Sequence, residues 1–140
     1  MNNMRIMKSG FTLLELLIVV VIIGLLAGIV GPKLFKNINK SEMTTAKAQI
    51  DTFVKALDNF RIDTGRYPSS QEGLQALLTN PTDLQGWNGP YLKKSVPNDP
   101  WGMPYQYAEP GSHNNEYDIF SFGKDKKEGG EGDNQDIGNW

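Results

Sequence analysis

Apolar residues form one continuous run near the start of this 140-residue chain. Residues 11–31 read FTLLELLIVVVIIGLLAGIVG, and the only charged side chain among them is Glu15. An α-helix needs about 20 apolar residues to cross the ~30 Å hydrocarbon core of a bilayer. The run therefore predicts a membrane-spanning helix over residues 11–31.

After this run the pattern becomes periodic, with apolar residues recurring every three or four positions. The stripe consists of Leu34, Ile38, Met43, Ala46, Ile50, Phe53, Leu57 and Phe60. One apolar face at this spacing predicts that the helix continues as an amphipathic stem over residues 32–64. Pro32 predicts a kink or local loosening, and Gly65 is a suitable residue for the helix to stop at.

The remaining residues, 65–140, predict a small globular part. Ser69 and Glu72 match a capping box that would open a short helix through Leu78. Alternating apolar positions predict two strands, over residues 104–109 and 116–122, joined by a turn-rich connection. Residues from Gly123 onward are predicted to be loop. The expected fold class is thus α+β, with a long N-terminal α-helix packed on a small antiparallel β-sheet.

Composition narrows the possible functions. The net charge of −2 provides no basic patch, which argues against nucleic-acid binding. The chain has no cysteine, so a domain this small needs a staple other than a disulfide, such as a metal or neighbouring subunits. His113 is the single histidine and no glycine-rich phosphate loop is present, so we do not expect an enzyme. Aromatic residues interleaved with prolines between Tyr67 and Tyr107 are expected to form a small core.

The start of the chain resembles a precursor that is processed. Arg5 and Lys8 precede the apolar run, as in an export signal, but the run is longer than that of an ordinary cleaved signal peptide. An uncleaved signal anchor is one reading. However, the junction KSGFTLLE resembles the processing site of type IV pilins and type II secretion pseudopilins. The resemblance implies a leader over residues 1–10, cleavage by a prepilin peptidase between Gly10 and Phe11, and N-methylation of Phe11.

Glu15 requires an explanation because a charged side chain within a membrane-spanning helix costs about 2.5 to 3.5 kcal/mol. The family resemblance implies a role in assembly, in which the carboxylate pairs with the amine of Phe11 on a neighbouring subunit. A pair within one helix is the alternative, since the first and fifth residues are near neighbours.

Three further stretches extend the resemblance over Ser9 to Trp140. These stretches, DTGRYPSSQEGLQALLTNP, WNGPYLKKSVPNDPWGMPYQY and EYDIFSFGKD, are similar to the major pseudopilins of type II secretion. Minor pseudopilins share only the N-terminal part, and type IV pilins usually carry a C-terminal disulfide.

The resemblance implies a type IV pilin-like fold and a helical homopolymer, the periplasmic pseudopilus, that drives export of folded proteins across the outer membrane. The partners implied are other copies of the chain, minor pseudopilins, the inner-membrane assembly platform and the prepilin peptidase. It also implies a single-pass protein of the bacterial inner membrane with its C-terminal domain in the periplasm. The alternatives are a type IV pilin, a minor pseudopilin, or a membrane-anchored periplasmic binding module.

The final loop, residues 122–136, is rich in oxygen-bearing side chains set among glycines, which suits a hard cation such as calcium. The spacing is not that of an EF-hand, because Lys127 and Gly129 occupy the third and fifth positions. From composition alone, a solvated acidic loop is the simpler interpretation. The family resemblance implies calcium as the cofactor. The ligands that it implies are Asp125, Asp133, Asp136, the backbone carbonyl of Phe122 and, less clearly, Gln135, where many members have an acidic residue.

Overall fold

The computed structural model describes residues 9–140, in which α1 (Leu13–Thr64) is unbroken through Pro32. The predicted helix is confirmed, but it begins at Leu13 rather than Phe11. Thr12 caps it: Thr12 Oγ1 accepts from the Glu15 backbone N–H at 3.2 Å, and Glu15 Oε2 accepts from the Thr12 N–H at 3.3 Å. The helix ends as predicted at Gly65, whose φ of 82° suits glycine.

The chain divides into two compact units, one up to Ile38 and one over Asn39–Trp140. In the first unit the apolar side chains of α1 are exposed, with Leu14 at 64% and Ile22 at 50%. This part of α1 is long and apolar enough to cross a membrane. Over residues 9–38, therefore, no protein core buries these side chains.

The second unit has a core built on the C-terminal half of α1. Six side chains of α1 are buried there: Ala46, Ile50, Phe53, Ala56, Leu57 and Phe60. They pack in one cluster with Leu77, from a short 3₁₀ helix described below, and with Ile119 and Ile137 of the sheet. The predicted amphipathic face is thus confirmed from Ala46 to Phe60, whereas Leu34 and Ile38 of the same stripe are exposed.

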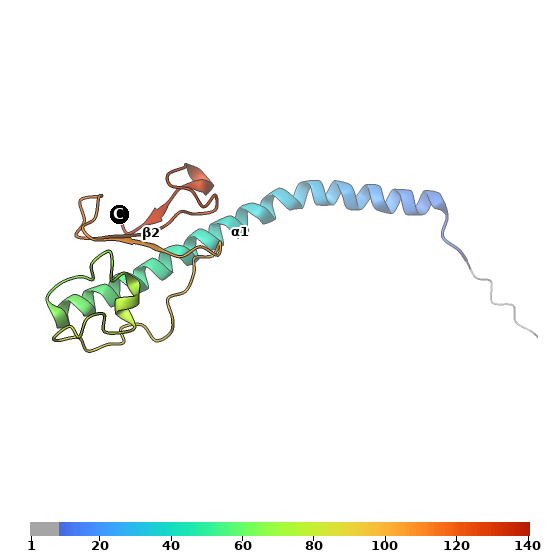
Figure 1. Ribbon diagram of the computed structural model, residues 1–140. Helices are drawn as coiled ribbons and strands as arrows, with labels where there is room; N and C mark the ends of the chain where they lie inside the picture. The colour runs from blue at the N-terminus through green and yellow to red at the C-terminus, as the bar shows by residue number, and fades with distance from the viewer. Residues whose placement is uncertain (1–8) are drawn as a thin grey trace, which may run out of the picture. The chain divides into compact units, whose positions relative to one another are not determined.

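The sheet has three antiparallel strands in the order β1-β2-β3 (Figure 1). Strands β1 (Gln106–Ala108) and β2 (Asp118–Ser121) lie inside the two predicted strands but are shorter. Strand β3 (Ile137–Gly138) falls where only loop was predicted, and that prediction is wrong at this point. Ile137 pairs with Ser121 and Gly138 with Phe120. A two-residue strand is too short to produce an alternating pattern, so only the pairing with β2 reveals it.

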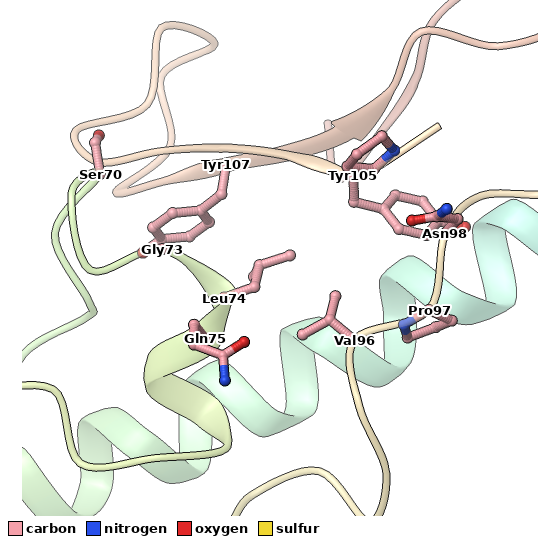
Figure 2. Close-up of a pocket in the computed structure, with 10 residues that line it drawn as sticks. Ser70, Gly73, Leu74, Gln75, Val96, Pro97, Asn98, Tyr105 and Tyr107 are labelled. Carbon is pink, nitrogen blue, oxygen red and sulfur yellow. The ribbon is translucent and has the colours of Figure 1, made fainter. Parts of the chain in front are cut away.

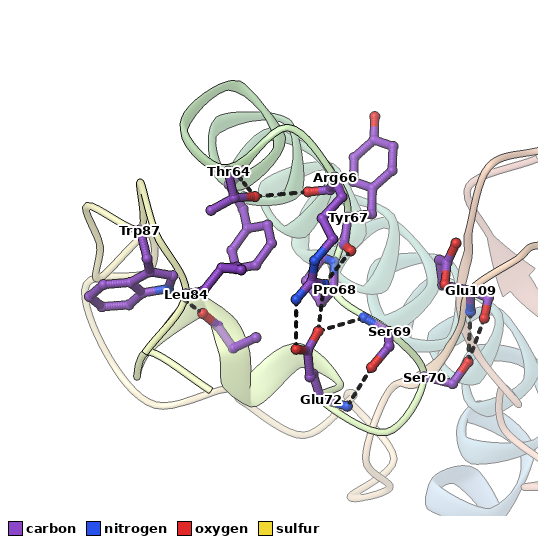
Figure 3. A network of polar contacts seen from close by, with 12 residues as sticks. Thr64, Arg66, Tyr67, Pro68, Ser69, Ser70, Glu72, Leu84, Trp87 and Glu109 are labelled. Carbon is purple, nitrogen blue, oxygen red and sulfur yellow. Dashed lines mark hydrogen bonds and ion pairs between the residues drawn. The ribbon is translucent and has the colours of Figure 1, made fainter. Parts of the chain in front are cut away.

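The segment after α1 keeps its predicted cap but not its predicted helix. Ser69 and Glu72 form the expected reciprocal bonds, and Arg66 binds the Glu72 carboxylate with two nitrogens, at 2.7 and 2.8 Å (Figure 3). The Arg66 guanidinium lowers the pKa of Glu72 from its ordinary 4.5 to about 2. Gly73 then has a φ of 61°, so only the short 3₁₀ helix η1 (Leu74–Leu77) follows.

The aromatic residues between Tyr67 and Tyr107 pack against the core, as predicted. Tyr107 of β1 extends toward Leu74 of η1, whereas Tyr105, just before β1, extends toward Asn98 (Figure 2). Both tyrosines line a shallow pocket of about 340 Å³. The Tyr107 hydroxyl donates to the Pro68 carbonyl at 2.7 Å. Burial raises the pKa values of both tyrosines, as expected for structural residues of a core.

Candidate functional site

The processing junction lies just before the helix. Gly10 and Phe11 are exposed and non-helical, and Phe11 has an exposed fraction of 85%. A Cβ added at Gly10 would meet no atom within 4 Å. The Gly10–Phe11 peptide bond is therefore sterically accessible. The rest of the predicted leader, with Arg5 and Lys8, lies outside the described residues.

Glu15 has a partner on its own chain. Its carboxylate accepts from the Thr12 backbone N–H and so completes the capping box at the start of α1. This contact was not predicted from the sequence, although the pattern Thr12-x-x-Glu15 matches a capping box. The pairing of Glu15 with the Phe11 amine of a neighbouring subunit stays a prediction.

The acidic loop holds its carboxylates partly by local bonds. Asp125 Oδ1 accepts from the Lys127 N–H at 3.1 Å, and Asp136 Oδ2 accepts from the Gly129 N–H at 2.9 Å. Both side chains are half-buried, whereas Gln135 is exposed. The loop therefore orients two of the proposed ligands before any ion is considered.

Two glycines allow the arms of this loop to approach each other. A Cβ on Gly123 would lie 2.6 Å from the Gln135 carbonyl oxygen, and a Cβ on Gly130 would lie 2.2 Å from that of Asn134. Both glycines also have positive φ, at 75° and 90°. Only glycine fits at these positions, and as a result backbone carbonyl oxygens meet the opposite arm.

One atom of the loop indicates a missing positive partner. Asp136 Oδ1 is buried, and within residues 9–140 no hydrogen-bond donor contacts it. Burying an unsatisfied carboxylate oxygen is costly, and a cation bound there would remove that cost. The donor set, carboxylates with nearby carbonyls, fits the oxygen ligands that calcium prefers. The residues present therefore fit calcium.

The predicted ligands are not all brought together. Asp133 accepts from the side chain of Asn39, on α1, at 3.1 Å. Over residues 9–140, no three Asp, Glu, His or Cys side chains gather closely enough to hold a metal by themselves. Any ion in this loop would thus depend on carbonyl oxygens as well as carboxylates.

The contacts of His113 are those of a structural residue and not those of a metal ligand. Its Nδ1 lies 2.8 Å from Asp118 Oδ2, and its ring stacks on Trp140 with centroids 3.6 Å apart. Asp118 is buried and also accepts from the backbone and the hydroxyl of Ser112. Burial by itself would raise the pKa of Asp118, but the bonds from His113 and then Ser112 outweigh burial and lower it. These contacts fix the β1–β2 connection against β2.

Comparison with known proteins covers nearly the whole chain. A family model described as type II secretion system (T2SS), protein G, matches residues 33–140. A second model, the prokaryotic N-terminal methylation motif, matches residues 5–31. The two matches meet near the junction between the apolar run and the amphipathic stem.

Relatives with the same description are similar over almost their full length. The type II secretion system core protein G of Pseudomonas aeruginosa is 44% identical over 139 residues, covering 97% of each chain. That of Vibrio cholerae is 45% identical over 143 residues, covering 100% of this chain and 96% of the relative. Among solved structures, the major pseudopilin from the type 2 secretion system of enterohaemorrhagic Escherichia coli matches with a TM-score of 0.67. It is 34% identical, and the match covers 76% of this chain and 89% of the other.

Proposed function

Because this chain belongs to the protein G family of type II secretion systems, whose members are structural subunits of the pseudopilus, we propose that it polymerises into a periplasmic filament that drives export of folded proteins. The observation that carries this proposal is the combination of an exposed apolar helix with a separate, self-contained globular unit. A subunit of this kind is anchored in a membrane through α1, and it can bury the apolar surface of α1 against other copies when it leaves the bilayer. The role is structural and involves no catalysis by this chain.

Processing precedes assembly in this proposal. A prepilin peptidase cuts the accessible bond between Gly10 and Phe11 and methylates the new amine of Phe11. The methylation motif over residues 5–31 supports this step. The leader lies on the cytoplasmic side of the inner membrane, and the globular unit lies in the periplasm. Minor pseudopilins and an inner-membrane platform are the other partners of assembly.

Glu15 acts at the assembly step. In the single chain its carboxylate caps α1 through the Thr12 N–H. In the filament the same carboxylate pairs with the cationic Phe11 amine of a neighbouring subunit, because a charge-assisted pair compensates both groups for leaving water. The capping bond then supports the free subunit, and the intersubunit pair supports the polymer.

Calcium stabilises the globular unit by cross-linking its final loop. Asp125, Asp133 and Asp136 would provide carboxylate oxygens and Phe122 a backbone carbonyl, while Gln135 stands where many family members have an acidic residue. The buried, unpartnered Asp136 Oδ1 supports this assignment. When bound, calcium would join the two arms of residues 122–136, which no disulfide can do in a chain without cysteine.

Substitution of Gly10 tests the proposed maturation. Gly10→Val should leave a full-length precursor in the membrane, because a β-branched side chain before the cut hinders the peptidase. A mass spectrum of the N-terminal peptide should show methylated Phe11 in the wild-type protein and an intact leader in the variant. Gly24→Val, farther along the same apolar run, is the matched control and should be processed. Processing of Gly10→Val at the wild-type rate would contradict the proposed junction.

A further inference from the structure

Trp140 packs on two rings that belong to other parts of the globular unit. Its indole stacks on the His113 imidazole, with ring centroids 3.6 Å apart and an interplanar angle of 9°. It also packs on Phe120 of β2, with centroids 5.6 Å apart. The residue before it continues the pairing of β3, because the Asn139 N–H donates to the Ile119 carbonyl at 3.2 Å. Trp140 therefore fastens the end of β3 to the β1–β2 connection, which carries His113.

Strand β3 needs such an anchor because it has only two residues and few hydrogen bonds of its own. Beyond it, the Asn139 side chain bonds to β2 and to the residue before β2. Its Oδ1 accepts from the Ile119 N–H at 3.0 Å, and its Nδ2 donates to the Tyr117 carbonyl at 3.1 Å. Asp136, a proposed calcium ligand, directly precedes β3. The contacts that hold β3 on β2 thus also position one arm of the acidic loop, residues 122–136.

The contact that holds His113 in place depends on charge. Its Nδ1 lies 2.8 Å from Oδ2 of Asp118, whose side chain is 2% exposed. Over residues 9–140, no lysine or arginine forms an ion pair with Asp118. A buried carboxylate without a cation is costly, and protonation of His113 supplies the missing positive charge.

His113 is also the side chain whose charge changes near neutral pH. The sequence has one histidine and no cysteine, and histidine is the side chain that ordinarily titrates between about pH 5 and 8. Three groups face its ring: the Asp118 carboxylate from β2, the Ser112 hydroxyl at 3.3 Å from its own connection, and the indole of Trp140. Burial would raise the pKa of Asp118, but the bonds from His113 and then Ser112 lower it from its ordinary 3.8, so Asp118 stays ionised over this range.

We propose that His113, Asp118 and Trp140 form a proton-dependent clasp that holds β3 on β2 and thereby positions Asp136 in the acidic loop. When His113 is protonated, the imidazolium pairs with Asp118 and lies over the indole, and its charge strengthens both contacts. When His113 is neutral, both contacts weaken and the end of β3 opens more often. The added stability is present at low pH and is lost as the pH rises and His113 loses its proton. Only the effect on calcium affinity rests on the proposed calcium function.

The first experiment measures the clasp without calcium. Hydrogen exchange of the full chain in detergent micelles gives the protection factor of the Asn139 backbone amide, which removes the intrinsic effect of pH on exchange. In the wild type we expect this factor to be about fivefold lower at pH 8 than at pH 5.5, the change expected for one net hydrogen bond.

Two variants of His113 bracket the wild type in this experiment. His113→Arg keeps a positive charge at both pH values and can stack on an indole, so its protection factor should be high at both. His113→Ala should give low protection at both. A wild-type protection factor that does not change with pH, or the wild-type pH dependence in His113→Arg, would overturn the clasp.

The second experiment tests whether the clasp positions the acidic loop. In calcium titrations of the full chain in micelles, the wild type should bind about threefold more weakly at pH 8 than at pH 5.5. Deprotonation of the ligands alone predicts the opposite trend, since metal ligands bind in their deprotonated form. His113→Arg should show no such weakening. Binding by the wild type that strengthens with pH would overturn the positioning role.

Substitution of Trp140 completes this test. Trp140→Ala should bind calcium about threefold more weakly than the wild type at pH 5.5. Ile62→Ala, at another exposed apolar side chain of the same unit, is the matched control and should bind as the wild type does. Equal affinities of Trp140→Ala and the wild type would contradict the positioning role. If the wild type binds no calcium, the proposed function of the loop fails, while the exchange experiment still decides whether the clasp exists.

Discussion

The two halves of α1 have similar apolar residues but opposite surroundings. In the first unit Leu17 is 60% exposed and Ile22 is 50% exposed, whereas Phe53 and Phe60 in the second unit are at most 1% exposed. Both halves are regular helix, so helix formation by itself does not decide what is buried. The first half needs a membrane or neighbouring subunits to cover it, and the second is covered by its own chain.

This difference separates assembly from folding. A change in the first half should affect the membrane and the filament while leaving the globular unit intact. A change in the second half should lower the free energy of unfolding of the globular unit. The predictions below use this separation, beginning with the largest effect.

Removing the charge of Glu15 should nearly abolish filament assembly without affecting folding. Glu15→Gln keeps an oxygen that can accept from the Thr12 N–H, so the capping box persists, but the variant cannot form an ion pair with the Phe11 amine. Sedimentation of pseudopili should show almost none for Glu15→Gln, with normal processing. Thr12→Val is the matched control, since it weakens the cap and keeps the charge. Normal filament yield from Glu15→Gln would show that capping is the main role of Glu15.

Phe60→Ala should lower the free energy of unfolding of the globular unit by about 3 to 5 kcal/mol, because removing a fully buried aromatic ring leaves a cavity. Thermal unfolding of the full chain in micelles measures this change. Leu17→Ala, in the exposed half of the same helix, should leave the melting temperature of the globular unit unchanged. Similar melting temperatures for the two variants would contradict the division of α1 into two environments.

Removing calcium should lower the free energy of unfolding of the globular unit by about 2.7 kcal/mol, if the calcium concentration was about a hundredfold above the Kd before removal. For a unit of this size, that corresponds to a melting temperature lower by about 10 °C. Asp125→Ala should abolish the response to chelator, and Gln135→Ala should reduce it only in part. Magnesium should not replace calcium, because it demands a tighter octahedral site. An identical wild-type melting curve in calcium and in excess chelator would mean that the loop is simply solvated.

Acid should weaken the segment after α1 through Glu72. Its pKa is lowered to about 2, so the stabilisation by Arg66 is complete above a pH of about 4.5 and is lost as the pH falls from there through about 2. The Arg66 side chain is 42% exposed and its charge is partly screened by solvent, so we expect the ion pair to contribute only about 1 to 2 kcal/mol to the free energy of unfolding. Glu72→Gln should remove this part of the pH dependence in urea unfolding measured at pH 2 to 5. Asp51→Asn, on the exposed face of α1, is the control. An unchanged pH profile in Glu72→Gln would show that the ion pair contributes nothing to stability.

Much of the fold could be predicted because it depends on local patterns. The unbroken helix to Thr64, its stop at Gly65 and the Ser69–Glu72 capping box follow from residues within a few positions of one another. The apolar run with Glu15 and the Gly10–Phe11 junction could likewise be predicted, because each is a contiguous stretch of the sequence. The family could be inferred for the same reason, since its motifs are contiguous stretches.

Strand β3 and the short helix after Ser69 could not be predicted correctly from the sequence. Ile137–Gly138 is a strand only because β2 lies beside it, and its two residues have no period of their own. Gly73 shortened the predicted helix after Ser69, because its left-handed backbone conformation breaks the hydrogen-bond ladder despite a correct cap. In each case the residue types are known from the sequence, but the backbone conformation of Gly73 and the pairing of β3 with β2 could not be predicted from them.

The sequence by itself determined the amphipathic stem and the family, and it predicted the membrane-spanning run and the processing junction, because each depends on the order and spacing of neighbouring residues. Only the tertiary structure decided which part of the apolar stripe is buried and which residues meet across the loop. Asn39 and Asp133 are 94 positions apart, and the burial of Asp136 Oδ1 likewise depends on how the chain folds. Such contacts arise when distant segments pack together, and their energies depend on distance and burial, which the order of residues does not specify.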